Sequence, residues 1–101
     1  MIEENATLAR ATSLMSSAVE GNLVILNIEN GLYHSLNPMA SWIWMQLESP
    51  IQVSRILEAL INEYAVERAQ AATDLIAVLE RFHEQGLITA IPYPVDHRAG
   101  I

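Results

Sequence analysis

Residues 22–47 have the sequence NLVILNIENGLYHSLNPMASWIWMQL, and this stretch decides the fold. Two runs typical of strands meet at Asn30-Gly31, a pair that favours hairpin turns because both central residues of a type I′ turn need positive φ. The stretch therefore predicts a β-hairpin with a two-residue turn. Such a turn predicts three cross-strand pairs, which are Ile28 with Tyr33, Leu26 with Ser35, and Ile25 with Leu36.

The second strand of this hairpin ends where a helix begins. Asn37 suits the N-cap position and Pro38 the first helical position, so we expect a helix from there to about residue 47. Because the strand is short and stops at the helix, we expect one rim of its hydrogen-bonding groups to stay unpaired. An open strand edge can accept another chain as an additional strand.

Helical spacing divides the side chains of this first helix into two groups. One stripe, expected to be buried, comprises Met39, Ala40, Ile43, Trp44 and Leu47. Trp42 and Met45 lie outside the stripe. We expect these two residues to face solvent or a partner protein.

Composition limits the class of protein. A chain of 101 residues suits one domain, and 51% hydrophobic against 17% charged residues leaves apolar surface for a partner. The net charge is −7, and the five basic residues are arginines spread along the chain. Nucleic-acid affinity depends on basic groups that displace counterions from phosphates, so nucleic acid is not an expected partner.

The sequence gives no support to an enzyme, a cofactor or a metal site. No cysteine is present, and the three histidines lack the close spacing of metal ligands. There is no Gly-x-Ser-x-Gly motif and no glycine-rich phosphate loop. The start lacks the pattern of a secretion signal, and no apolar run reaches the roughly 18 residues of a membrane span. We expect a non-catalytic cytoplasmic protein without membrane contact.

The remaining segments complete the predicted element order. Residues 1–12 lack periodicity and are expected to form a flexible arm, and residues 13–19 a first strand. A second helix from about residue 53 buries a stripe that consists of Val53, Ile56, Leu57, Leu60 and Tyr64.

A third helix covers about residues 67–85 and ends at Gly86, a typical C′ residue. Its predicted buried stripe consists of Ala72, Leu75, Ile76, Leu79, Phe82 and His83. Leu87 and Ile88 are expected to fold back on the core, and residues 89–101 to form an extended tail. The order predicts a winged-helix-like α+β domain at residues 13–88, with a three-stranded antiparallel sheet followed by three helices.

Several of these features together resemble a known family. They are the segment Gly31-Leu-Tyr-His-Ser-Leu-Asn37, Ala40 and Ile43-Trp44 in the first helix, a second helix ending at Tyr64, and Leu79 to Gly86-Leu87-Ile88. Over about residues 14–88 the chain resembles the PqqD-like family, also called RiPP recognition elements. Within it the chain looks most like the stand-alone recognition protein of lasso-peptide pathways, although His34 stands where a second aromatic residue is usual.

The resemblance implies a function in peptide recognition. In such proteins the leader of a ribosomally made precursor peptide adds as a strand beside the third strand of the sheet and lies against the third helix. Members of the lasso type bind a Tyr-x-x-Pro leader and deliver it to a separate transglutaminase-like cysteine protease. A chain without cysteine cannot be that protease, so the resemblance implies the binding half of a split enzyme.

The resemblance also implies the residues of the site. The expected leader-binding residues are Leu32, Tyr33, His34 and Ser35 on the strand, and Ala71, Asp74, Leu75, Val78 and Arg81 on the third helix. Trp42 and Met45 are the expected contacts with the partner. Each has a plainer interpretation, since Tyr33 and His34 could cap the sheet and Asp74 and Arg81 could be ordinary solvated helix residues.

Two other functions stay open at this point. A PqqD-type peptide chaperone would present its peptide to a radical-SAM enzyme instead of a protease. A winged-helix nucleic-acid binder would use the third helix for recognition, but that helix carries Asp74, Glu80 and Glu84 where phosphate contacts need basic groups.

Overall fold

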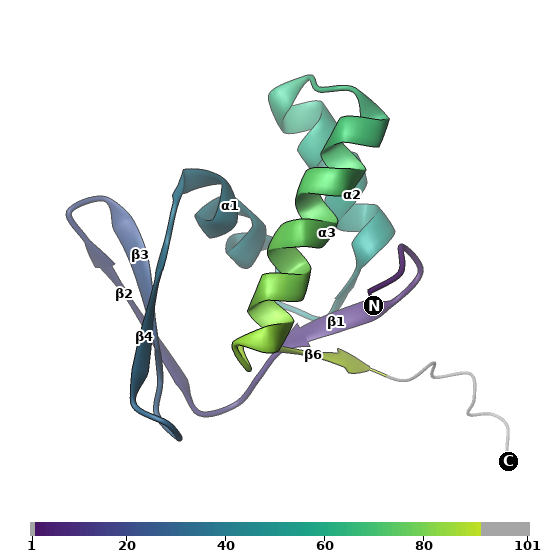
Figure 1. The fold of residues 1–101 in the computed structure, drawn as a ribbon. Coiled ribbons are helices and arrows are strands. Elements are labelled where there is room, and N and C mark those ends of the chain that lie inside the picture. The colour runs from purple at the N-terminus through teal and green to yellow at the C-terminus, as the bar shows by residue number, and fades with distance from the viewer. Residues whose placement is uncertain (1, 92–101) are drawn as a thin grey trace, which may run out of the picture.

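The computed structural model describes residues 2–91 and consists of three helices and two small antiparallel sheets (Figure 1). The elements in chain order are β1 (Thr7–Arg10), β2 (Leu14–Val19), β3 (Asn22–Asn27), β4 (Leu32–Leu36), α1 (Pro38–Gln46), β5 (Ile51–Gln52), α2 (Val53–Tyr64), α3 (Arg68–Glu84) and β6 (Ile88–Ile91). The predicted α+β fold, with the sheet β2-β3-β4 ahead of three helices, is confirmed.

A second sheet with the strand order β5-β1-β6 corrects the prediction for both ends of the domain. Residues 1–12 were predicted as a flexible arm, which is wrong for β1, because Leu8 is fully buried and pairs with Ile51 on one side and Ala90 on the other. The start of the predicted tail forms β6, and its remainder, residues 92–101, lies outside the described residues. Short strands whose partners are distant in sequence carry too little periodicity to be predicted.

The β3–β4 hairpin forms, but its predicted two-residue turn is wrong. Tyr33 pairs with Leu26 and His34 with Ile25, which leaves residues 28–31 as a four-residue loop. Gly31 has a φ of 73°, whereas Asn30 is not in the positive-φ region, so the type I′ geometry is absent. The Asn30 side chain instead accepts a hydrogen bond from the Leu32 N–H at 2.9 Å. Because the register moves by two residues, every side chain keeps its predicted face.

The predicted ends of α1 and α3 are confirmed. The side-chain oxygen of Asn37 accepts a hydrogen bond from the Ala40 N–H at 2.8 Å, and Pro38 follows as the first helical residue. At the end of α3, Gly86 has a φ of 75° and the Leu87 N–H donates to the Phe82 carbonyl at 2.9 Å. This Schellman pattern turns the chain toward β6 and buries Leu87 and Ile88, as expected.

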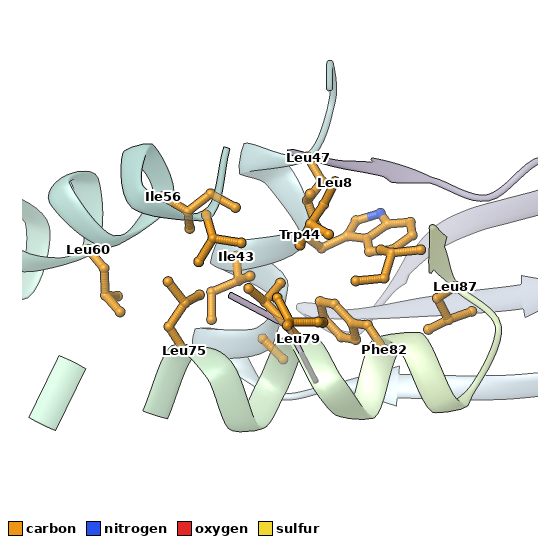
Figure 2. Packing of buried hydrophobic residues seen from close by; sticks show 14 of the residues in the cluster. Leu8, Ile43, Trp44, Leu47, Ile56, Leu60, Leu75, Leu79, Phe82 and Leu87 are labelled. Carbon is orange, nitrogen blue, oxygen red and sulfur yellow. The ribbon is translucent and has the colours of Figure 1, made fainter. Parts of the chain in front are cut away.

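The core lies between the helices and the two sheets. Figure 2 shows Leu75, Leu79 and Phe82 of α3 pointing toward Ile43 and Trp44 of α1. Large apolar side chains from distant segments thus hold α3 against α1. Among residues 2–91 no helix has the length and apolar character needed to cross a membrane.

Two of the predicted helix stripes need correction. In α2 the first four predicted residues are buried, but Tyr64 is 40% exposed because it ends the helix, where its ring meets Trp42 edge to face at 5.8 Å. In α3 the buried residues are Ala71, Leu75, Leu79 and Phe82, while His83 is exposed. The core stripe of α3 is therefore rotated toward Ala71.

Candidate functional site

The edge strand β4 offers unpaired backbone groups. In the sheet order β2-β3-β4, β4 pairs with β3 and with no other strand of residues 2–91. The N–H and C=O groups on its other side therefore have no strand partner within that range. Such an edge can take up an extended segment of another chain.

A groove of about 340 Å³ runs along this free edge, between β4 and α3. One side is the strand and the residue that follows it, and the other side is the second half of α3. The lining residues are Tyr33, His34, Ser35, Leu36, Asn37, Ala40, Val78, Arg81, Phe82 and Gln85. A strand edge beside a helical wall can bind the backbone of a peptide and its side chains at once.

The groove brings together five of the nine residues predicted to bind a leader. They are Tyr33, His34 and Ser35 from β4 and Val78 and Arg81 from α3. Two others do not line it. Leu32 lies at the loop end of β4 and is 56% exposed, and the Asp74 carboxylate accepts a hydrogen bond from the Gln70 side-chain nitrogen at 2.9 Å.

Ala71 and Leu75, also predicted to bind a leader, are buried in the core and do not line the groove. Ala71 is 1% exposed and Leu75 is 0% exposed. Both belong to the core stripe of α3, and Figure 2 shows Leu75 pointing into the core. The predicted stripe began at Ala72, and the true one begins one residue earlier. Of the residues predicted on α3, those in its first half therefore do not line the groove, and only Val78 and Arg81 do.

Five of the ten lining residues were not predicted from the sequence. The missed residues are Leu36, Asn37, Ala40, Phe82 and Gln85. Gln85 could have been found, because it continues the spacing of Val78 and Arg81 by one more helical turn. Asn37 and Ala40 follow directly from the immediate passage of β4 into α1, whereas Phe82 is a core residue whose edge reaches the groove.

The floor of the groove is apolar, and its charge is confined to one residue. Leu36, Ala40 and Phe82 are each at most 6% exposed. Among the described residues that line it, Arg81 is the only arginine, lysine, aspartate or glutamate. The Nε2 atom of His34 is buried and has no hydrogen-bond partner within residues 2–91. In the same range no group of three or more His, Asp or Glu side chains is placed to hold a metal ion.

The two residues predicted to contact a partner protein lie on α1, outside the groove. Met45 is 61% exposed and lines a second cavity, of about 560 Å³, formed with the α1–α2 connection. Trp42 is half-buried and packs against the core and Tyr64. Of the two, only Met45 presents a freely accessible apolar side chain.

Comparisons with known proteins agree with this architecture. The sequence family described as Coenzyme PQQ synthesis protein D (PqqD) matches residues 22–88. A search of curated proteins found no matching sequence. The chain is similar in structure to the protein in "TbiB1 in Complex with the TbiA(beta) Leader Peptide", with 26% identity and a TM-score of 0.73, covering 84% of this chain and 96% of that one.

A second solved structure shows the same fold. It is described as "Lasso peptide synthetase B1 complexed with the leader peptide", and it matches with 23% identity, a TM-score of 0.68, and coverage of 81% of this chain and 96% of the other. The family match spans more than half of the sequence, including the hairpin, the three helices and the turn after α3. The chain therefore belongs to the PqqD family, the family of PqqD-like RiPP recognition elements.

Proposed function

We propose that the chain binds the leader of a ribosomally made precursor peptide, as an added strand on β4 in the groove beside α3. The observation that carries this proposal is the coincidence of a free strand edge with a groove whose other wall is a helix. Main-chain hydrogen bonds to β4 supply affinity, and alternate side chains of the leader supply specificity in the groove. The two similar solved structures, both described as complexes with leader peptides, support this function.

The finer part of the proposal concerns the pathway. We infer that the leader is of the Tyr-x-x-Pro type and that the chain presents it, in the cytoplasm, to a transglutaminase-like cysteine protease of lasso-peptide maturation. The similarity to a lasso peptide synthetase B1 protein favours this pathway over a radical-SAM one. The chain itself contributes binding and no catalytic group.

A fluorescence-polarisation titration tests the binding. A panel of labelled leader peptides of the Tyr-x-x-Pro type, the TbiA(beta) leader among them, should include at least one with saturable binding between about 1 nM and 1 μM, or about 8 to 12 kcal/mol. If no leader of the panel binds, the proposed function is wrong.

A pair of neighbouring variants locates the site. Val78→Glu places a charge in the groove wall and should weaken binding more than tenfold, because an unpaired carboxylate there loses its hydration when the peptide docks. Ala77→Glu makes the same charge change one residue away, on the exposed side of α3, and should leave affinity within about twofold. Equal losses for the two variants would place the peptide elsewhere.

The partner protease is tested by co-expression and pull-down with the cysteine protease encoded beside the precursor. Met45→Glu should reduce capture, because Met45 is the exposed member of the predicted partner contacts. Met15→Glu is the matched control, since Met15 is 60% exposed but lies on β2. If Met15→Glu reduced capture and Met45→Glu did not, the protease would bind at β2 and not at α1.

A further inference from the structure

We propose that the groove selects peptides that carry an acidic side chain, whose carboxylate pairs with Arg81. This inference rests on the proposed function and adds to it the chemistry of the ligand. Arg81 lies on the α3 wall of a groove whose floor is formed by the apolar side chains of Leu36, Ala40 and Phe82. Its charge is therefore the one strong electrostatic feature that a docked peptide meets.

The acidic residues of α3 do not neutralise Arg81. Glu80 and Glu84 line a different cavity, of about 230 Å³, together with Ile2 and Ala90. The Glu80 carboxylate accepts a hydrogen bond from the Ile2 N–H at 3.3 Å, which holds it on that side. Across residues 2–91 the ion pairs within 4 Å join Arg68 to Glu4 and to Glu58, and none involves Arg81.

This local charge is opposite in sign to the charge of the whole chain. The net charge is −7, so the average field of the protein repels an acidic peptide. At physiological ionic strength charges act over about 8 Å, so a peptide in the groove responds mainly to Arg81. Arg81 is therefore the position in the groove that favours an anionic side chain of the peptide.

The geometry of a guanidinium suits this selection. It can donate two parallel N–H hydrogen bonds to one carboxylate of the peptide, whereas it repels the ammonium group of a lysine at the same position. Arg81 is exposed, so the gain from one acidic residue is moderate, about 1.4- to 5-fold in affinity. Rejection of a lysine at the same position increases the difference between the two peptides.

Arg81 also has a role that needs no ligand. It stands in the last turn of α3, where a cation interacts favourably with the helix dipole. That role affects the stability of the free protein but not the choice between two peptides. The preference for acidic over basic peptides is therefore the decisive measurement.

The experiment starts from the tightest leader found in the panel. Each position outside Tyr-x-x-Pro is replaced in turn by Asp, Asn or Lys, and every peptide is titrated against the wild type, Arg81→Glu and Arg55→Glu. Arg55 is exposed and lies outside the groove, so Arg55→Glu repeats the change in net charge without touching the site. At one or two neighbouring positions the wild type should prefer Asp to Lys by about tenfold. Arg81→Glu should reverse the preference there, and Arg55→Glu should retain it.

The other outcomes separate this inference from the proposed function. Peptides that bind with the same Asp-to-Lys preference in wild type and Arg81→Glu overturn the inference and leave the function intact. Equal changes in Arg81→Glu and Arg55→Glu also overturn it, since the effect is then one of overall charge. If Arg81→Glu unfolds, Arg81→Gln should lose the preference for Asp without reversing it, and a preference kept in that variant overturns the inference.

Discussion

The indole of Trp44 meets the ring of Phe82 edge to face, with the ring centroids 5.5 Å apart and the planes at 87°. Trp44 lies on α1 and Phe82 on α3, and each is 2% exposed. Because Phe82 also lines the groove, this pair connects the core to the floor of the site. The distance between β4 and the helical wall thus depends on how α1 and α3 pack.

Phe82→Ala should reduce the free energy of unfolding by about 3 to 5 kcal/mol, because it leaves a cavity and removes the aromatic contact with Trp44. Urea denaturation followed by tryptophan fluorescence measures the change. Tyr33→Ala removes an aromatic ring that is 71% exposed and should cost only about 0.5 kcal/mol. Similar losses for the two variants would mean that Phe82 does not anchor α3.

Asn37→Ala should destabilise the protein by about 1 kcal/mol, because the Ala40 N–H at the start of α1 loses its acceptor. Asn37→Asp keeps an acceptor at the N-cap and should retain nearly all of the stability. Thermal denaturation by circular dichroism compares the two. Equal losses for Ala and Asp would show that the cap contributes nothing.

Gly86→Ala should cost about 1 kcal/mol, because a residue with a side chain is strained at a φ of 75°. Space is not the cause, since an added Cβ would meet the Asn27 side chain at an ordinary 3.5 Å. The reciprocal control is Ala65→Gly, since Ala65 caps α2 with a φ of 53°. This variant should stabilise the protein by about 0.5 to 1 kcal/mol in the same unfolding assay. If Gly86→Ala and Ala65→Gly changed the free energy of unfolding in the same direction, the explanation by backbone strain would be wrong.

Arg10→Lys should cost about 1 to 3 kcal/mol, because Arg10 donates to the Trp44 carbonyl at 2.6 Å while its guanidinium lies 4.5 Å from the centre of the Trp44 ring. Burial lowers the pKa of Arg10, with Glu48 acting in the opposite direction. Arg68→Lys alters an exposed pair and should cost less than about 1 kcal/mol. If chemical denaturation showed a larger loss in the free energy of unfolding for Arg68→Lys than for Arg10→Lys, this explanation would be wrong.

Hydrogen exchange can identify the strand edge that the leader uses. The outward amides of β4 should gain protection when a leader binds, while β2, the other edge of the same sheet, should not. The choice of edge follows from the groove, which lies beside β4 and is lined by no residue of β2. Protection of β2 alone would contradict the proposed binding mode.

Local signals in the sequence were sufficient for most of the elements. The N-cap at Asn37, the C′ glycine at Gly86 and the helical spacing of α2 act over a few residues, so they are visible without knowledge of the fold. The hairpin was also predicted, but its turn was not. The side chains of Asn27 and Asn30 accept hydrogen bonds from the N–H groups of Glu29 in the loop and of Leu32 at the start of β4, which stabilises a four-residue loop instead.

The site was predicted only in part, because its two walls come from segments that meet through the core. Tyr33, His34, Ser35, Val78 and Arg81 were expected and do line the groove, although their contact with a peptide stays a prediction. Ala71 was expected on the peptide side but is buried, because an error of one residue in the phase of a helical stripe exchanges a groove residue for a core residue. Leu75 is buried as its place in the predicted core stripe implied, and it does not line the groove.

The sequence by itself determined the three helices, the hairpin and the family, because capping, turn chemistry and spacing are local properties of the chain. Only the tertiary structure decided that Thr7–Arg10 pairs with Ile88–Ile91 and that the free edge of β4 faces the second half of α3. Those arrangements depend on contacts between residues far apart in the chain. They form because the buried side chains of α1 and α3 pack in one way, which no short stretch of sequence specifies.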